Sequence, residues 1–316
     1  MTGRRRDKTA PRKQSEGRAS VSSERNAAGL SDASGAAPCA AAMFGANTYS
    51  YMRSLSAEAC LSRLADQGFD EFEVMVHPGH LWADDLSAEQ RRALRRFIEA
   101  RGLTLVSLNM PNIDINVASA APGMRAYSLD LVTETVRLAG DLGARGVVIG
   151  PGKANPLFPA PAEELLGYFF EALDQLCPVA QSGGTALWVE NMPFAFLPGI
   201  AELLGALKRY GNDAVRIIYD IANAYFIGED FAEGLKQCRA SLELVHLSDT
   251  GRQAFRHDPV GLGTVPFADV PRALEAVGYN AKAKPKPMLE IISREPDTDI
   301  IASAAKLAVL GFKRPH

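Results

Sequence analysis

Residues 185–193 read TALWVENMP, an apolar run of the kind found in buried strands that ends in a carboxylate, Glu190. A strand covered by helices on both faces is expected to be apolar throughout. Burying an unpaired carboxylate is also costly in free energy. Glu190 must therefore lie where the strand leaves the core, or it must face a positively charged partner.

Apolar, β-rich runs alternate with helical patterns along most of the chain. The runs lie at residues 43–51, 71–77, 103–110, 146–152, 186–191, 215–221, 242–249 and 287–293. Helical patterns are predicted from residue 87 and over 124–142, 162–176, 198–209, 231–240, 267–277 and 298–310. The pattern at Ser87 opens with a capping box, because Gln90 follows three residues later. Glycines stand where helices should end: Gly68, Gly102, Gly143, Gly211 and Gly278.

Alternation of strand and helix predicts a parallel sheet. Eight such units over about 270 residues are typical of a closed (β/α)₈ barrel. The competing architecture, a doubly wound open sheet, usually has a GxGxxG turn after its first strand, and NTYSYMRS at residues 47–54 contains none. We therefore predict an α/β protein whose residues 43–316 form a single (β/α)₈ TIM barrel domain.

The first 42 residues differ in composition from the barrel. Residues 1–25 carry eight Arg or Lys side chains against three acidic ones, and large apolar residues are almost absent up to residue 42. This composition predicts a disordered basic tail. A nucleic-acid-binding arm and a twin-arginine export signal are alternatives, but no apolar stretch follows the arginines as an export signal requires. We favour a solvated tail, or a working start at Met43.

Composition limits the class of protein. The chain has 316 residues, a formal net charge of −3 and 47% hydrophobic residues. No run of about 18 apolar residues is present, so no membrane span is predicted. Four cysteines lie far apart without a CxxC pair, which indicates reduced thiols in a cytoplasmic protein without a disulfide or zinc framework. The sequence leaves open whether the protein forms a homo-oligomer.

Four late strands place a metal-binding residue type at the carboxyl end of the strand, where TIM barrels have their active sites. These residues are Glu190, Asp220, His246 and Glu290. Two positions earlier on each strand, on the same face, stand the large apolar residues Trp188, Ile218, Leu244 and Met288. We expect these to form a packed layer beneath the polar mouth. Three carboxylates and one imidazole suit one divalent ion, Mn²⁺, Mg²⁺ or Co²⁺, with Zn²⁺ tolerated.

The chain resembles the xylose isomerase-like TIM barrels, which include sugar isomerases and epimerases, inosose dehydratases and endonuclease IV-like enzymes. The resemblance is carried by GFDEFEVMV, LGARGVVIGPG, VENMP, YDIANA, VHLSDT, HDPVGLGTVPF and LEI. It implies that Glu190 and Glu290 both bind the metal and act as an acid/base pair on a small carbohydrate or polyol-derived substrate.

The resemblance also suggests substrate contacts. His257 lies on the loop after the seventh strand, and Arg256 is its alternative there. Asn223 occupies a position where family members commonly have histidine, and it could bind a substrate hydroxyl. His77 ends the second strand and is a further candidate.

The endonuclease IV-like branch is disfavoured. That branch uses several additional histidines and three zinc ions, whereas this chain has five histidines and carries Phe255 where an Asp-x-His pair would need aspartate. The acidic barrel also lacks the positive face that phosphate backbones require, so nucleic acid is not an expected partner.

Three functions compete. The first is a metal-dependent sugar or sugar-acid isomerase or epimerase, which transfers a proton at the carbon next to a chelated carbonyl. The second is a dehydratase of the inosose or 3-dehydroshikimate type, working at the same site. The third is a non-catalytic sugar-binding barrel, against which the retention of both Glu190 and Glu290 argues.

Overall fold

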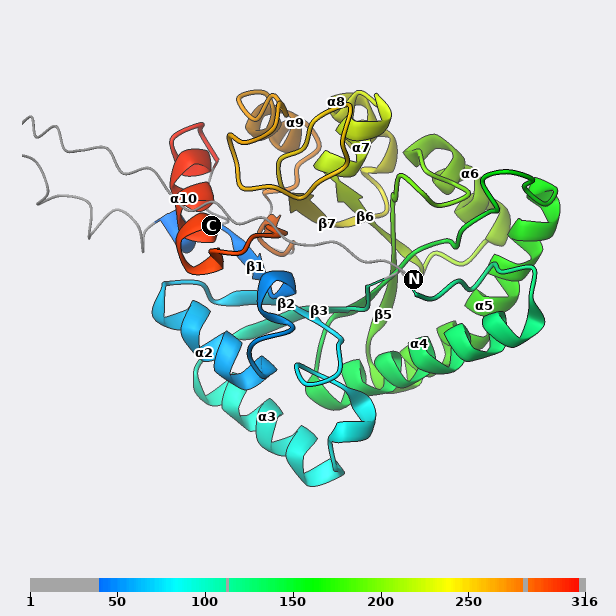
Figure 1. Ribbon diagram of the computed structural model, residues 1–316, viewed down its shortest axis with the longest axis horizontal. Coiled ribbons are helices and arrows are strands. Elements are labelled where there is room, and N and C mark those ends of the chain that lie inside the picture. The colour runs from blue at the N-terminus through cyan, green and yellow to red at the C-terminus, as the bar shows by residue number, and fades with distance from the viewer. Residues whose placement is uncertain (1–39, 112–113, 281–283, 313–316) are drawn as a thin grey trace, which may run out of the picture. The chain divides into compact units, whose positions relative to one another are not determined.

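The computed structural model describes residues 40–111, 114–280 and 284–312. Eight parallel strands close into one barrel in the order β1 to β8, as the sequence predicts (Figure 1). The strands are β1 (Gly45–Asn47), β2 (Glu71–Met75), β3 (Thr104–Asn109), β4 (Gly146–Ile149), β5 (Ala186–Glu190), β6 (Arg216–Asp220), β7 (Leu242–Leu247) and β8 (Met288–Leu289). Nearly all of the predicted tail, residues 1–42, lies outside the described residues.

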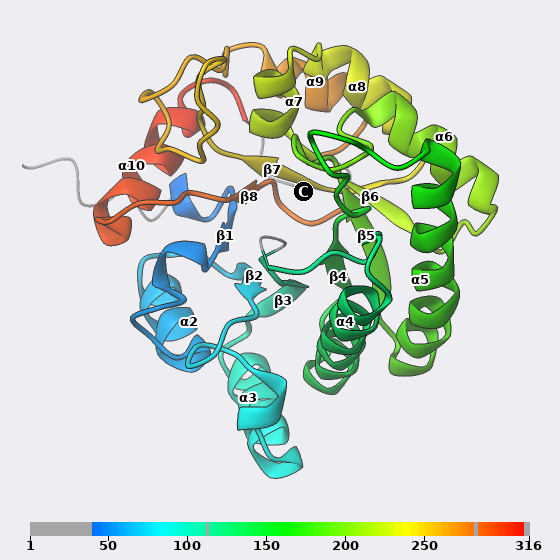
Figure 2. The same ribbon diagram turned by 45° about the vertical axis from the view of Figure 1, so that its right-hand side comes forward.

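The helices lie around the outside of the strands (Figure 2). They are α2 (Ala57–Asp66), α3 (Ala88–Ala100), α4 (Pro122–Leu142), α5 (Ala162–Gly183), α6 (Ile200–Tyr210), α7 (Ile221–Ile227), α8 (Phe231–Cys238), α9 (Val270–Ala276) and α10 (Pro296–Ala308). Short 3₁₀ turns occur at Tyr49–Tyr51 and Ala83–Asp85. In the part of the chain that the structure describes, no helix is long and apolar enough to span a membrane.

Local signals account for most of the element boundaries. Ser87 and Gln90 form the predicted capping box at the start of α3. The five glycines expected to end helices all have positive φ, which residues with side chains rarely adopt. The first strand is shorter than its apolar run because the Oδ1 atom of Asn47 accepts a hydrogen bond from the Tyr49 amide and turns the chain. Helix α7 was not predicted, and α2 was indicated only by Gly68 at its end.

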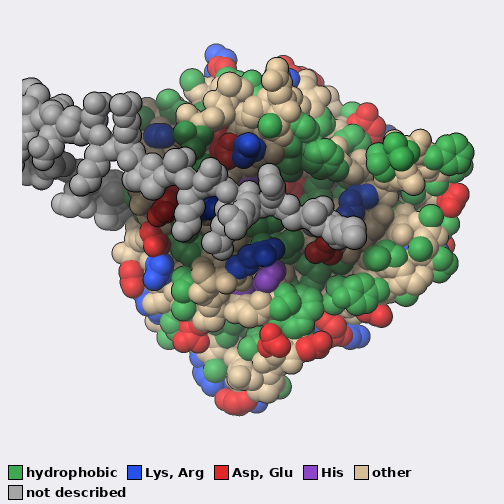
Figure 3. Space-filling view, viewed as in Figure 1, with side chains coloured by type: hydrophobic (Ala, Val, Ile, Leu, Met, Phe, Trp, Pro, Cys, Tyr) green, Lys and Arg blue, Asp and Glu red, His purple; other side chains and the backbone are tan. Residues whose placement is uncertain are grey.

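Large hydrophobic side chains are not confined to the interior. They gather on the right-hand side of the face in Figure 3, where α4 and α5 lie in Figure 1. Leu157 and Phe158, in the segment that precedes α5, are 93% and 87% exposed. Phe194, in the segment between β5 and α6, is 64% exposed.

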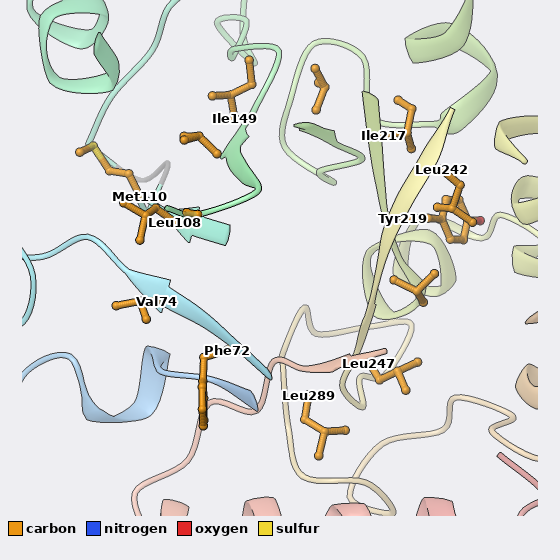
Figure 4. Close-up of a cluster of buried hydrophobic side chains, with 14 of the residues drawn as sticks. Phe72, Val74, Leu108, Met110, Ile149, Ile217, Tyr219, Leu242, Leu247 and Leu289 are labelled. Atoms are coloured by element: carbon orange, nitrogen blue, oxygen red, sulfur yellow. The ribbon is translucent and has the colours of Figure 1, made fainter. Parts of the chain in front are cut away.

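The strands alternate between two apolar layers. One layer packs between strands and helices and includes Phe72, Leu108, Ile217 and Leu289 (Figure 4). The other fills the barrel interior and consists of Val106, Val148, Trp188, Ile218, Leu244 and Met288. The predicted layer beneath the mouth is therefore confirmed, because its four members all belong to this interior cluster.

Candidate metal and substrate site

Four side chains converge at the carboxyl ends of β5 to β8. Each of Glu190, Asp220, His246 and Glu290 offers one atom, and these atoms all lie within 4.8 Å of one another. The Nδ1 atom of His246 is 3.3 Å from Glu290 Oε2, 3.5 Å from Glu190 Oε1 and 3.8 Å from Asp220 Oδ2. All four residues are buried. The fold thus brings together the four residues that the strand pattern singles out.

Asp220 ends β6 and also starts α7. Its Oδ1 atom accepts a hydrogen bond from the backbone amide of Asn223 at 2.6 Å, which is N-cap geometry. Its Oδ2 atom is buried without a hydrogen-bond partner. The cap fixes the carboxylate, so that the second oxygen is held toward the cluster.

Two asparagines hold Glu190 in relation to β6. Asn223 donates from Nδ2 to Glu190 Oε1 at 3.1 Å and to the Asn191 carbonyl at 2.9 Å. Asn191 in turn accepts from the Asp220 amide at 2.8 Å and donates to the Asp220 carbonyl at 3.1 Å. Asn223 therefore orients a carboxylate of the cluster, in addition to lining the cavity beside it.

Burial and close neighbours shift the pKa values of the cluster residues. Burial raises the pKa of Glu190 and of Asp220 to about 7. Burial would lower the pKa of His246, but the carboxylates of Glu73 and Glu290 outweigh it and raise that pKa well above its ordinary value. For Glu290, burial is outweighed by His257 and His246, which lower its pKa.

The donor set fits a divalent metal ion. Among the described residues, the buried polar atoms that lack a hydrogen-bond partner include Asp220 Oδ2, Glu290 Oε2 and both ring nitrogens of His246. Such atoms are rarely left unsatisfied in a folded protein. A cation bound between the three carboxylates and His246 Nδ1 would satisfy Asp220 Oδ2, Glu290 Oε2 and Nδ1, whereas His246 Nε2 lies 3.3 Å from Glu73 Oε1.

A cavity of about 360 Å³ opens beside the cluster. Glu190, Glu290, Asn223 and His257 are among the residues that line it. The Nδ1 atom of His257 is 2.9 Å from the Ser248 hydroxyl and 3.3 Å from Glu290 Oε2. The cavity is thus large enough for a small organic ligand and is bordered by both glutamates.

Comparison with known proteins identifies the family. The sequence pattern of the xylose isomerase-like TIM barrel family matches residues 61–308. The chain belongs to the xylose isomerase-like TIM barrel family.

Proteins of known name and proteins of known structure are similar to this chain. An L-ribulose 3-epimerase of Mesorhizobium japonicum is 23% identical over 70% of this chain and 72% of its own. An uncharacterized protein of Methanocaldococcus jannaschii is 25% identical over 71% of this chain and 77% of its own. A solved L-ribulose 3-epimerase superposes with a TM-score of 0.68 at 22% identity, covering 84% of this chain and 92% of that one. A 3-keto-D-glucoside 4-epimerase from E. coli also reaches 0.68, at 18% identity, covering 85% and 98%. These two structures share the fold.

In this member of the family, a further carboxylate lies behind the cluster. Glu73 on β2 is fully buried and accepts hydrogen bonds from Asn47 at 2.6 Å, Ser107 at 2.6 Å and Asn109 at 3.0 Å. Its Oε1 atom is 3.3 Å from His246 Nε2. Glu73 was not predicted as a site residue from the sequence, although the strand pattern indicates that it faces the barrel interior. Phe72 and Val74 belong to the outer layer, so strand alternation turns Glu73 into the barrel.

Two predicted substrate contacts, His77 and Arg256, do not line the cavity in the described structure. The His77 ring contacts the carbonyl of Pro78 at 2.8 Å, and the Arg256 side chain is 63% exposed. His80 is the buried histidine of this region, with Thr48 Oγ1 at 2.9 Å and the Leu55 carbonyl at 2.6 Å. Of the four predicted substrate contacts, His257 on the loop after β7 and Asn223 in α7 line the cavity.

Proposed function

We propose that the protein is a divalent-metal-dependent sugar or sugar-acid epimerase or isomerase that moves a proton at the carbon next to a carbonyl. The main support for this proposal is that Glu190 and Glu290 belong to the buried cluster and also line the cavity. Relatives named as sugar epimerases, such as the L-ribulose 3-epimerase of Mesorhizobium japonicum, support the same class of chemistry.

The metal would be held by Glu190, Asp220, His246 and Glu290. When bound, a divalent cation polarises a carbonyl and its neighbouring hydroxyl, which acidifies the C–H bond between them. The two glutamates would remain within reach of the substrate because they face the cavity. Asp220 and His246 are fully buried, so their role would be to hold the ion.

The glutamates differ in their neighbours, which suggests a division of labour. Glu290 lies beside His257, and its pKa is lowered although burial opposes this. Glu190 lies beside the neutral amide of Asn223, and burial raises its pKa. Two carboxyl groups that flank one substrate and have different neighbours can divide proton transfer, one as base and the other as acid. We assign Glu290 as the base and Glu190 as the acid in one direction, with the roles exchanged in the reverse direction.

Solvent deuterium incorporation tests this assignment. Metal-loaded protein is incubated with a panel of ketoses and sugar acids in deuterated water, and deuterium at the carbon next to the carbonyl is followed by NMR. Turnover should fall at least about a hundredfold in Glu190→Gln and in Glu290→Gln. In the direction in which Glu290 is the base, deuterium incorporation should be lost in Glu290→Gln and should persist in Glu190→Gln.

Glu58→Gln is a matched control, because Glu58 is an exposed residue of α2 far in sequence from the cluster, and it should retain wild-type rates. A dehydratase would give a different result. Formation of an ultraviolet-absorbing conjugated enone from an inosose or a dehydroshikimate-type acid, without exchange into any ketose, would reject an epimerase.

A further inference from the structure

Three phenylalanine rings from separate segments pack together beside the cavity. Phe194 follows β5, Phe226 belongs to α7, and Phe255 lies between β7 and α9. Their ring centroids are 6.1 Å (Phe194–Phe226), 5.4 Å (Phe194–Phe255) and 5.3 Å (Phe226–Phe255) apart, with tilted or edge-to-face geometry. We call these three residues the aromatic wall. Phe194 is 64% exposed, so the wall presents apolar surface to solvent.

The aromatic wall is continuous with the candidate site. Phe194 and Phe255 line the same cavity as Glu190 and Glu290. The Phe255 ring also meets the His257 ring edge-to-face, at a centroid distance of 5.1 Å. A ligand held at the glutamates would therefore extend toward the phenylalanines within a single cavity.

Much of the remaining lining is apolar as well. It includes Ile115, Val117, Ile149 and Met192. Asn116 also lines the cavity, but its side chain is occupied by the backbone of Lys153, at 2.9 Å to both the amide and the carbonyl. A free monosaccharide carries a hydroxyl on nearly every carbon, and apolar surface offers those hydroxyls no partner once water is displaced.

We propose that the aromatic wall binds an apolar, ring-sized substituent of the substrate. The substrate class is then a sugar derivative with an aromatic or alicyclic group attached, and the polar sugar part lies at the glutamates. Ring stacking against phenylalanine and burial of exposed apolar surface supply the recognition. The sugar half of this inference rests on the proposed function, whereas the aromatic wall is an independent observation.

Paired glycosides test the inference by binding alone. Methyl and phenyl β-glycosides of glucose, galactose, mannose and xylose are titrated into Mn²⁺-loaded protein by calorimetry. In at least one pair, the phenyl glycoside should bind about fivefold to tenfold more tightly than the methyl glycoside. Phe194→Ala should remove most of this difference and leave the affinity for the methyl glycoside unchanged. Its exposure makes this truncation tolerable for folding.

Phe158→Ala is the matched control, because Phe158 is also an exposed phenylalanine but does not line the cavity, and it should preserve the difference. Equal affinity within every pair, or no binding of any phenyl glycoside at millimolar concentration, would overturn the inference. Deuterium exchange at the carbon next to the carbonyl is measured on the same preparation, with ketoses and with keto derivatives of the phenyl glycosides as substrates. Exchange without a phenyl preference rejects the aromatic subsite and keeps the proposed function. A phenyl preference without exchange keeps the subsite and rejects the epimerase.

Discussion

Glu73 and His246 face each other inside the barrel, with Glu73 Oε1 3.3 Å from His246 Nε2 and both side chains fully buried. Metal-binding histidines commonly direct their second ring nitrogen at a carboxylate, which sets the tautomer and the orientation of the ring. Here Nε2 faces Glu73, and Nδ1 faces the carboxylates of Glu190 and Glu290. We therefore infer that Glu73 positions His246 for a metal without being a ligand itself.

Replacing Glu73 tests that role. Glu73→Gln should weaken metal affinity by about tenfold to a hundredfold, since the carboxylate no longer orients the ring. Nitrogen-15 NMR of Zn²⁺-loaded protein should show that His246 loses the wild-type tautomer. Glu71→Gln is the matched control, because Glu71 on the same strand instead accepts a hydrogen bond from the Lys286 amide. Unchanged affinity and tautomer in Glu73→Gln would show that Glu73 only packs the barrel.

Substitution of the cluster should remove the metal. We expect Glu190→Gln, Asp220→Asn, His246→Ala and Glu290→Gln each to lower metal occupancy, measured by elemental analysis after gel filtration. The rise in thermal midpoint that added metal gives the wild type should shrink in parallel, because only a folded site binds the ion. Asn223→Ala should keep most of the metal, since Asn223 contacts Glu190 through its amide nitrogen. Full occupancy in the four variants would contradict a metal site.

His80 should make stability depend on pH. Burial lowers its pKa, so below about pH 6.5 the unfolded chain takes up a proton that the folded protein resists. Neutral His80 therefore adds to the free energy of unfolding above that pH, and this stabilisation is lost as the pH falls. Urea unfolding between pH 8 and 5 should show a steeper loss of stability in the wild type than in His80→Gln. Parallel curves for the wild type and His80→Gln would refute the prediction.

A close contact in the barrel interior predicts a sensitive glycine. A Cβ atom on Gly146 would lie 2.3 Å from the Trp188 ring, so Gly146→Ala forces the interior layer apart. We expect a loss of about 1–3 kcal/mol in the free energy of unfolding, the usual scale of overpacking. Gly167→Ala, in α5, meets nothing within 4 Å and should be neutral or stabilising by up to about 1 kcal/mol. Chemical denaturation measures both, and a neutral Gly146→Ala would show that the barrel can relax.

The barrel and its four converging residues could be read from local patterns. In a parallel barrel, strand alternation assigns each residue to the interior or the outer layer, and the end of the strand sets its height. Glu190, Asp220, His246 and Glu290 each stand two positions after an interior apolar residue, so their meeting follows from the pattern alone.

Other features depend on contacts between distant segments. Glu73 is visible as a polar residue in an apolar strand, but its neighbours Asn47 and Asn109 come from β1 and β3. The directions of His77 and Arg256 depend on loop conformations, which side-chain type does not dictate. The aromatic wall joins three segments between residues 194 and 255. Periodicity determines which way a strand residue faces, because the strand backbone is regular. Loop residues have no such regularity, and only tertiary packing decides which of them meet.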